Sequence, residues 1–266
     1  MIRVFWCEDT LTGILTGVYD AWDSRLGHQN VRLSSAAAED LELFCEYTDV
    51  EPDVEKAGKV FRTVKRRMGE EAALMIAYAS ACPHDEKADA VYRMIVIGLH
   101  LPDGREICHM LTRPEVRLIS ELRKKAWHIA HRYMGFVRFR ELENGVLFSE
   151  IEAEADILAM IAPHFADRLP GENWAILDRN RQKAAVHPAG KNWFILEEVD
   201  EEKLSLPCLS REEPYFQELW REFHRAIGIR ERENMALQQA FLPLKFRNVM
   251  TEFWETCGQK QTYKQP

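Results

Sequence analysis

Hydrophobic positions follow two different periods along the chain, and the change between them divides the sequence. Up to about residue 133 the apolar residues recur every three or four positions, which predicts amphipathic helices. Gly69 is placed to stop one helix, Pro83 separates two others, and Pro114 occupies a first helical position. A short strand at 2–6 precedes these helices, and a polar loop is expected around 27–35. The first predicted helix begins after Asp9-Thr10, and further helices are predicted at 54–68, 70–81, 85–99 and 114–133.

Beyond residue 133 the pattern changes to alternation with period two. Residues 136–140 and 146–151 flank Glu143-Asn144-Gly145, which predicts a hairpin whose paired residue numbers sum to 288. This register pairs Val137 with Ile151 and Phe139 with Ser149. A helix at 153–165 and strands at 174–178, 184–187 and 193–197 are expected to follow, and then a helix at 212–227.

The order of these elements predicts an α+β protein, in which an N-terminal helical region is followed by an antiparallel sheet backed by helices and by a helical C-terminal tail. The acidic run at 197–202 is interpreted as a solvated linker, and the last residues lack apolar periodicity. A single compact domain is the alternative to a division of the chain into four segments. The expected segments are a helical region at 1–112, an α+β core at 113–200, a helical segment at 201–257 and a disordered tail at 258–266.

The composition narrows the class of protein. The 266 residues are 46% hydrophobic and 29% charged, which is typical of a folded globular chain. No apolar run is long enough to cross a bilayer, and acidic residues come too early for a signal peptide, so a cytoplasmic location without membrane attachment is expected.

The six cysteines are widely scattered, which predicts free thiols and no metal or iron–sulfur site. Glycine-rich phosphate loops and GxSxG or HExxH motifs are absent, which excludes the commonest nucleotide-binding and hydrolase classes. We expect no cofactor.

The net charge of −8 is unevenly distributed. Residues 56–67 contain six basic residues and no acid, and residues 113–140 contain eight basic residues against two acids. Lys59, Arg62 and Arg66 are expected on the exposed face of the predicted helix at 54–68. Arg117 and Lys124, on the predicted helix at 114–133, are expected to form a second row. Such a face is suited to phosphate contacts, although a plain solvated helix surface fits the same pattern.

The predicted hairpin supplies a second candidate site. Its outer face would carry Phe136, Arg138, Arg140 and Phe148, a basic and aromatic platform of the kind that stacks unpaired bases. The same register opposes Arg138 to Glu150, which would instead give a sheet surface that satisfies itself.

Three acid–base residues supply a third candidate. His164 and Asp167 lie near a helix end and Asp178 on the next strand, a set that could activate water in a hydrolytic enzyme. A histidine near a helix C-terminus also has a structural explanation, because it interacts favourably with the helix dipole. His128 and His131 on an exposed helix face are either half of a metal site or phosphate contacts. The residues therefore leave enzyme activity undecided.

Several segments resemble one bacterial family. The segments 134–141 (MGFVRFRE), 163–168 (PHFADR) and 174–179 (WAILDR), with a tail from 231 to 253, are similar to a domain of unknown function. That domain occurs in proteins of DNA metabolism or DNA repair encoded beside a radical-SAM protein, and also fused to uracil-DNA-glycosylase domains. The resemblance covers nearly all of residues 1–253 and implies no catalytic residues.

The resemblance implies an accessory protein that binds nucleic acid, expected to be DNA, and acts with a radical-SAM partner. Two other functions remain open at this point. One is a stand-alone hydrolytic enzyme on nucleic acid, similar to a glycosylase or a nuclease, and the other is a protein-interaction scaffold.

Overall fold

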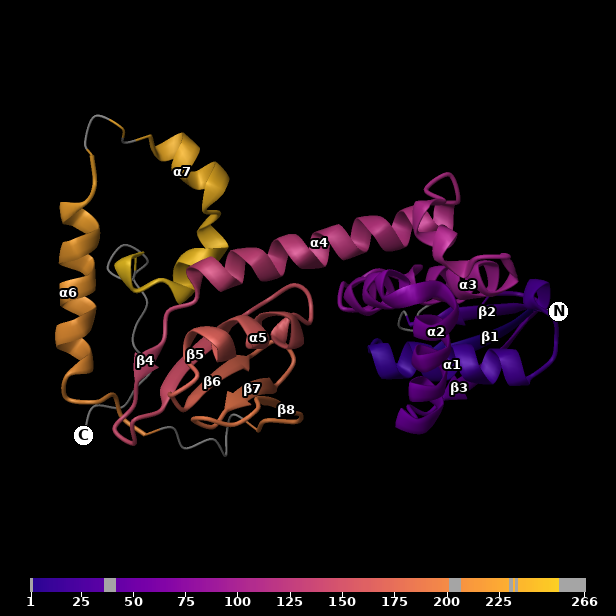
Figure 1. The fold of residues 1–266 in the computed structure, drawn as a ribbon, viewed down its shortest axis with the longest axis horizontal. Coiled ribbons are helices and arrows are strands. Elements are labelled where there is room, and N and C mark those ends of the chain that lie inside the picture. The colour runs from indigo at the N-terminus through magenta and orange to yellow at the C-terminus, as the bar shows by residue number, and fades with distance from the viewer. Residues whose placement is uncertain (1, 36–41, 201–206, 230–231, 233, 254–266) are drawn as a thin grey trace. The chain divides into compact units, whose positions relative to one another are not determined.

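The computed structural model describes residues 2–35, 42–200, 207–229, 232 and 234–253. The chain divides into two compact units, Met1–His128 and Ile129–Pro266, and the boundary falls inside helix α4 (Pro114–Phe136). The expected tail at 258–266 and residues 201–206 of the predicted linker and helical segment lie outside the described residues. Each unit is described by itself (Figure 1).

The first unit contains a small parallel sheet in the order β2-β1-β3. Strand β1 (Ile2–Cys7) pairs with β2 (Val31–Ser34) on one side and with β3 (Cys45–Val50) on the other. The polar loop expected around 27–35 was wrong in part, because it contains the 3-10 helix η1 (His28–Asn30) and β2. Val31 and Leu33 are buried while Arg32 and Ser34 are half-exposed, which is the alternation of a strand. This alternation covers only four residues, which is too short to predict a strand from the sequence.

Helix α1 (Leu11–Asp23) packs on this sheet, and its start confirms the prediction from Asp9-Thr10. The hydroxyl oxygen of Thr10 accepts a hydrogen bond from the backbone N–H of Gly13 at 3.0 Å, which satisfies one of the free N–H groups of the first turn. Ile14, Leu15 and Val18 are buried on its inner face. The amphipathic pattern of the sequence therefore identified the core side of this helix.

Helix α2 (Val54–Ser80) consists of two helical segments, because Gly69 leaves the helical conformation with φ 90° and ψ 170°. This confirms the predicted helices at 54–68 and 70–81 with a stop at Gly69, a conformation that glycine adopts without steric cost. The side chain of Asp53 begins the first segment by accepting hydrogen bonds from the N–H groups of Glu55 and Lys56.

The rest of the first unit consists of α3 (Lys87–His100), the 3-10 helix η2 (Gly104–His109) and the beginning of α4. Tyr92, Met94 and Ile95 of α3 are fully or almost fully buried. Lys87 is also buried, and its ammonium group donates to the carbonyl oxygens of Ser80 and Cys82 at the end of α2. This cation therefore closes the turn between α2 and α3.

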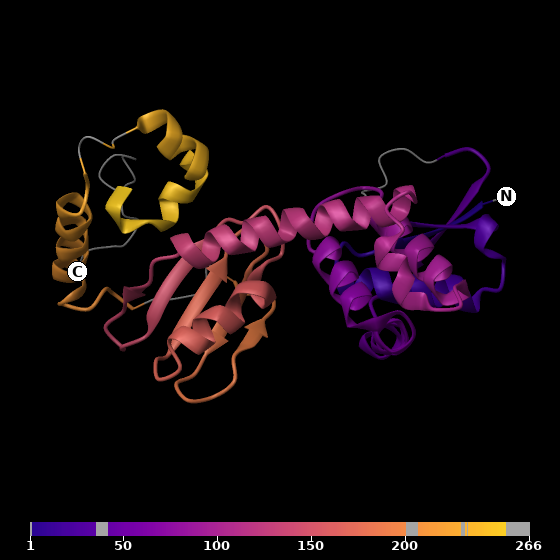
Figure 2. The same cartoon turned by 45° about the horizontal axis from the view of Figure 1, so that its top comes forward.

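The second unit is built on a sheet in the order β4-β5-β6-β7-β8, and α5 (Leu158–Arg168) lies over one of its faces (Figures 1 and 2). The α+β class is thereby confirmed. The prediction that the sheet is antiparallel throughout was wrong, because β5 and β6 are parallel. Helix α5 carries the chain from the end of one of these strands back to the start of the other, and such a crossover gives parallel neighbours. The strands are β4 (Arg140–Glu141), β5 (Leu147–Ile151), β6 (Trp174–Asp178), β7 (Lys183–His187) and β8 (Phe194–Leu196).

The hairpin around Gly145 keeps the predicted register but is much shorter than predicted. Arg140 pairs with Phe148 and Glu141 with Leu147, so the paired numbers sum to 288 as expected. The predicted strand at 136–139 was wrong, since α4 continues to Phe136 and the N–H of Arg138 donates to the carbonyl of Val249 at 3.2 Å. The pairs of Val137 with Ile151 and of Phe139 with Ser149 therefore do not form.

Helices complete the second unit after the sheet. Helix α6 (Glu213–Ala226) agrees with the predicted helix at 212–227, and the 3-10 helix η5 (Thr251–Phe253) packs against it. Helix α7 (Met235–Phe241) and the 3-10 helix η4 (Leu244–Val249) lie between them in the sequence. Among the helices that the structure describes, none is long and apolar enough to span a bilayer.

Candidate functional site

The first segment of α2 presents the basic face that the sequence predicts. Lys59, Arg62 and Arg66 are exposed, whereas Ala57 and Val64 on the opposite face are buried. Within the described part of the chain, none of these three cations forms an ion pair with a carboxylate. The Lys59 ammonium lies 5.7 Å from the centroid of the Tyr19 ring. Three solvated cations on successive helical turns are therefore available to an anionic ligand.

Two other cations of this segment are already neutralised. Lys56 pairs with Asp20 at 2.8 Å, and Lys65 pairs with Glu70 at 2.6 Å. These pairs lower the free charge of the basic run, so its capacity for phosphate contacts is smaller than the count of residues indicates.

Arg117 and Lys124 are exposed on α4, as predicted. Helix α4 meets the second segment of α2, where Arg123 pairs with Glu71 at 3.6 Å. Lys59, Arg62 and Arg66 lie on the first segment, before the break at Gly69. The structure thus brings the first three cations together and leaves Arg117 and Lys124 on another helix.

The basic and aromatic platform expected on the hairpin does not form. Phe148 is 4% exposed in a core cluster, and Phe136 packs against Phe246 at a ring distance of 5.4 Å. Arg140 pairs with Glu150 at 2.9 Å. The expected stacking surface is lost because the chain before Arg140 leaves the sheet and turns toward η4 and η5.

Arg138 enters a different cluster in the second unit. Its guanidinium group pairs with Glu252 at 3.0 Å, donates to the carbonyl of Gly135 at 2.9 Å and lies 5.3 Å from the centroid of the Trp220 ring. The sequence opposed Arg138 to Glu150, whereas its actual carboxylate partner is 114 residues away.

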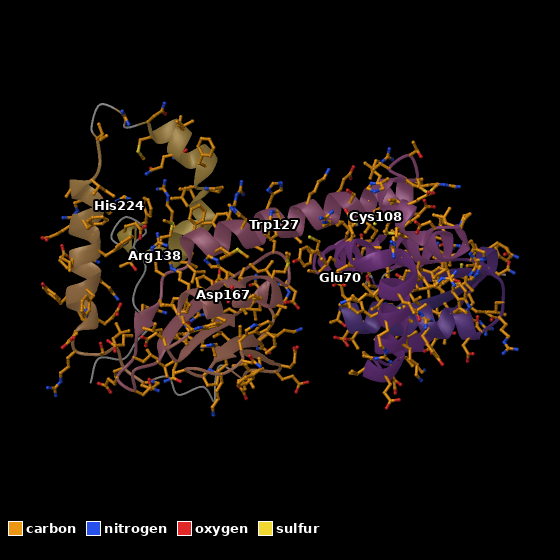
Figure 3. The ribbon with its side chains drawn as sticks, viewed as in Figure 1. Glu70, Cys108, Trp127, Arg138, Asp167 and His224 are labelled. Carbon is orange, nitrogen blue, oxygen red and sulfur yellow. The ribbon has the colours of Figure 1, made fainter. Side chains whose placement is uncertain are left out.

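His164, Asp167 and Asp178 are not brought together. Phe165 and Trp174 are in ring contact at 6.3 Å, which places the end of α5 beside the start of β6. Asp178 is the last residue of that strand, about 13 Å from its start at the usual rise per residue. Asp167 lies exposed on α5 (Figure 3). These three side chains therefore do not share a cleft.

Asp178 is instead part of a buried polar cluster. Its carboxylate accepts hydrogen bonds from the Asn180 N–H and the Arg181 guanidinium, both at 3.1 Å. Burial raises the pKa of this carboxyl above its ordinary value, although the charge of Arg181 acts in the opposite direction. The two hydrogen bonds fix the turn between β6 and β7.

The structure assembles no metal centre from the candidates of the sequence. His128 and His131 are exposed on α4. Among the described residues, no group of three or more His, Cys, Asp or Glu side chains is arranged to hold a metal ion.

The described cysteines are free thiols, as predicted. Cys7, Cys82 and Cys108 are buried, and burial raises the pKa of Cys7 to about 12. The thiolate of such a residue is scarce at neutral pH, so Cys7 is unsuited to act as a nucleophile. Cys257 lies outside the described residues.

A groove in the second unit was not found from the sequence. It has a volume of about 580 Å³ and lies between α6, the segment of Arg138 and Phe139, and Thr251. Phe216, Trp220 and Phe223 of α6 line it, although each is at least 38% exposed. The groove thus combines a set of exposed aromatic side chains with a few polar groups, which is a usual composition for a ligand site.

Polar residues of α6 lie at one side of this groove. Gln217 and Glu213 are each 7% exposed, and the Gln217 side-chain N–H donates to Glu213 at 2.7 Å. The other carboxylate oxygen of Glu213 accepts from the backbone N–H of Glu141 at 2.9 Å. Glu213 is therefore satisfied within the protein and holds the amide of Gln217 in place.

The sequence contained one signal of this groove. Apolar residues recur at 216, 219, 220 and 223, which predicts a broad apolar face on α6. Nothing in the sequence placed Arg138, Phe139 and Thr251 opposite that face, because they are far from α6 along the chain.

The sequence was compared with models of protein families and with curated proteins. The family model described as a domain of unknown function, DUF4130, matches residues 85–252, which is more than half of the chain. No curated protein matches the sequence.

Proposed function

The chain belongs to the family defined by the domain of unknown function DUF4130, and we propose a function for it from its own surface. We propose that it is an accessory protein that binds nucleic acid. The observation that carries the proposal is the row of exposed, unneutralised cations Lys59, Arg62 and Arg66 on α2. Such a row contacts phosphates and releases the counterions that they hold.

The uneven distribution of charge supports this proposal. An acidic chain repels a polyanion at long range, so phosphate contacts need a local concentration of cations. The first segment of α2 supplies it, because Lys59, Arg62 and Arg66 face solvent without a carboxylate partner in the described residues. A protein partner with an acidic surface is the competing explanation of the same face.

The finer part of the proposal rests on the resemblance of 134–141, 163–168 and 174–179 to proteins of DNA metabolism. We propose that DNA is the ligand and that a radical-SAM protein supplies the redox chemistry. On this view the chain presents the substrate and its partner modifies it. Co-purification of the two proteins, followed by binding to DNA, tests that arrangement.

The central experiment is a titration of fluorescently labelled DNA across a range of salt concentrations. The wild type is compared with the triple variant Lys59→Glu, Arg62→Glu and Arg66→Glu. We expect affinity to fall steeply with salt in the wild type, and the triple variant to bind all sequences more weakly with a flatter salt dependence.

A matched control separates local contacts from net charge. Arg168, Lys191 and Arg211 are exposed cations of the second unit, and their reversal to Glu changes the net charge by the same amount. Equal loss of binding in both triple variants, or binding of the wild type that does not respond to salt, would contradict the proposal.

A further inference from the structure

The aromatic side chains of the groove form one continuous surface on α6. Phe216, Trp220 and Phe223 are spaced by four and three residues and so lie on one face of the helix. They are 51%, 38% and 52% exposed, and the rings of Trp220 and Phe223 are 5.8 Å apart. This surface offers flat apolar faces to a ligand.

The central ring of this surface is held in a fixed position. The indole N–H of Trp220 donates to one carboxylate oxygen of Glu252 at 3.0 Å. The other oxygen of Glu252 pairs with Arg138, whose guanidinium group lies 5.3 Å from the centroid of the indole ring. The Glu252 side chain is 2% exposed, so its carboxylate is largely shielded from water. A ring that is already oriented loses little conformational entropy when a ligand stacks on it.

A hydrogen-bonding edge lies beside the aromatic surface. The side-chain N–H that Gln217 donates to Glu213 fixes which end of its amide is the nitrogen. Among the described residues, no group donates to the side-chain oxygen of Gln217, and this residue lines the groove. The amide therefore keeps an acceptor and a second N–H that have no partner among the described residues, beside rings on which a flat ligand can stack.

We propose that this groove binds an unpaired nucleobase, which stacks on the aromatic face of α6 and is read along its edge by Gln217. This inference rests on the proposed nucleic-acid function and names the part of the ligand that the groove takes. A base has a flat apolar face and adjacent donors and acceptors on its edge, and both features have a counterpart here. Glutamine forms a bidentate pair with adenine, which makes adenine the favoured base.

The composition of the groove favours a base over an apolar peptide helix. Of the four apolar α6 residues that line it, only Leu219 is aliphatic. Gln217 also lines it, and a peptide helix docked by its apolar face would leave the side-chain oxygen of Gln217 without a donor. The volume of about 580 Å³ is of the size that takes a small molecule or a nucleotide.

The test compares three ligands of equal length at one salt concentration: a single strand of deoxyadenosine, a strand of abasic sites and a duplex. Phe216→Ala removes an exposed ring of the groove. Tyr215→Ala is the matched control, because Tyr215 is the adjacent aromatic residue of α6, is 67% exposed and does not line the groove. Thermal unfolding of each variant checks that the fold is kept.

We expect the wild type to bind the deoxyadenosine strand more tightly than the abasic strand and the duplex. Phe216→Ala should lower affinity for the deoxyadenosine strand by roughly tenfold, within the range for loss of one stacked base, and leave the abasic strand unchanged. Tyr215→Ala should change neither affinity. Reversal of the three α2 cations should weaken binding to both single strands.

Equal binding of the abasic and deoxyadenosine strands, or equal effects of Phe216→Ala and Tyr215→Ala, would overturn the nucleobase proposal while leaving the phosphate contacts of α2 intact. If Phe216→Ala abolishes capture of a protein partner without altering either strand, the groove is a protein-docking site and the proposal fails. Absence of binding to every strand would overturn the proposed function together with this inference.

Discussion

Asp178 is completely buried and forms an ion pair at 3.1 Å with Arg181, which follows it by three residues in the turn after β6. The guanidinium group of Arg181 also donates to the carbonyl oxygens of Ala153 and Glu154. Arg181 therefore remains satisfied without the carboxylate, and the pair joins β6 to the segment that follows β5. This local role explains Asp178 without any catalytic function.

We predict that Asp178→Asn changes the stability at pH 7 by no more than about 2 kcal/mol, because the amide removes a buried charge but turns its NH2 group toward one of the two N–H donors, Asn180 and Arg181. Burial raises the pKa of Asp178 in the folded state above the ordinary value of 3.8. The wild type consequently gains stability from this group as the pH falls through the raised pKa toward 3.8, and the variant does not. Denaturant unfolding across acidic pH should show the stability of the wild type rising relative to that of the variant as the pH falls. A constant difference at all pH values would contradict the assignment.

A second prediction concerns Lys87, which is 1% exposed and pairs with Asp9 at 2.8 Å. Lys87→Met should lower the free energy of unfolding by about 2–4 kcal/mol, since the buried carbonyls of Ser80 and Cys82 lose their donor. Lys65→Met is the control, because Lys65 is an exposed lysine paired with Glu70, and it should cost less than about 0.5 kcal/mol. Chemical unfolding of both variants measures the contrast, and similar losses would be inconsistent with a structural role for the buried cation.

A third prediction tests the close approach of η2 to α2. A Cβ atom at Gly104 would lie 2.5 Å from the carbonyl oxygen of Arg67 and 2.8 Å from that of Gly98. Because both obstacles are backbone atoms, Gly104→Ala should destabilise the first unit by roughly 1–3 kcal/mol. Gly171→Ala meets no atom within 4 Å and should be neutral in the same thermal unfolding experiment. A Gly104→Ala melting temperature equal to that of the wild type would refute the packing argument.

A fourth prediction concerns thiol reactivity. At pH 8 a small alkylating reagent should modify Cys208, which is exposed, and more slowly Cys45, which is half-buried. Burial raises the pKa of Cys7 to about 12 and also raises the pKa of Cys108, so both should stay unmodified in the folded protein. Mass spectrometry of the labelled peptides reads this out, with unfolded protein as the control in which both thiols react. Rapid labelling of Cys7 under native conditions would count against its burial.

The helices of the first unit could be predicted because their signals are local. Thr10 and Gly69 mark a helix start and a helix break by their own chemistry, and apolar spacing identifies the buried faces of α1 and α2. Strand β2 could not be predicted, since its four residues become a strand only when β1 provides backbone partners.

The sheet of the second unit shows where local patterns stop being informative. Alternation at 136–139 is typical of a strand, but the backbone of Arg138 bonds to Val249, and this partner is invisible in a local window. Likewise, period-two patterning identified β5 and β6 but not their relative direction, which the crossover through α5 decides.

The basic row of α2 and the groove of the second unit also differ in how far the sequence predicts them. The cations of α2 lie on one helix, so spacing alone identified Lys59, Arg62 and Arg66 as a row. The groove joins Arg138, Gln217 and Thr251 through tertiary packing, and no sequence period connects them. Its position became apparent only from the fold.

The break at Gly69 also has a consequence for how α2 moves. The non-helical backbone at this residue interrupts the ladder of i to i−4 hydrogen bonds, so residues 54–68 and 70–80 form two separate ladders. The second ladder carries Ala72, Ala73, Ile76 and Ala79, all fully buried. We therefore expect amide hydrogens of the cationic segment to exchange with deuterium through local opening, while those of the second segment exchange only when the whole unit unfolds.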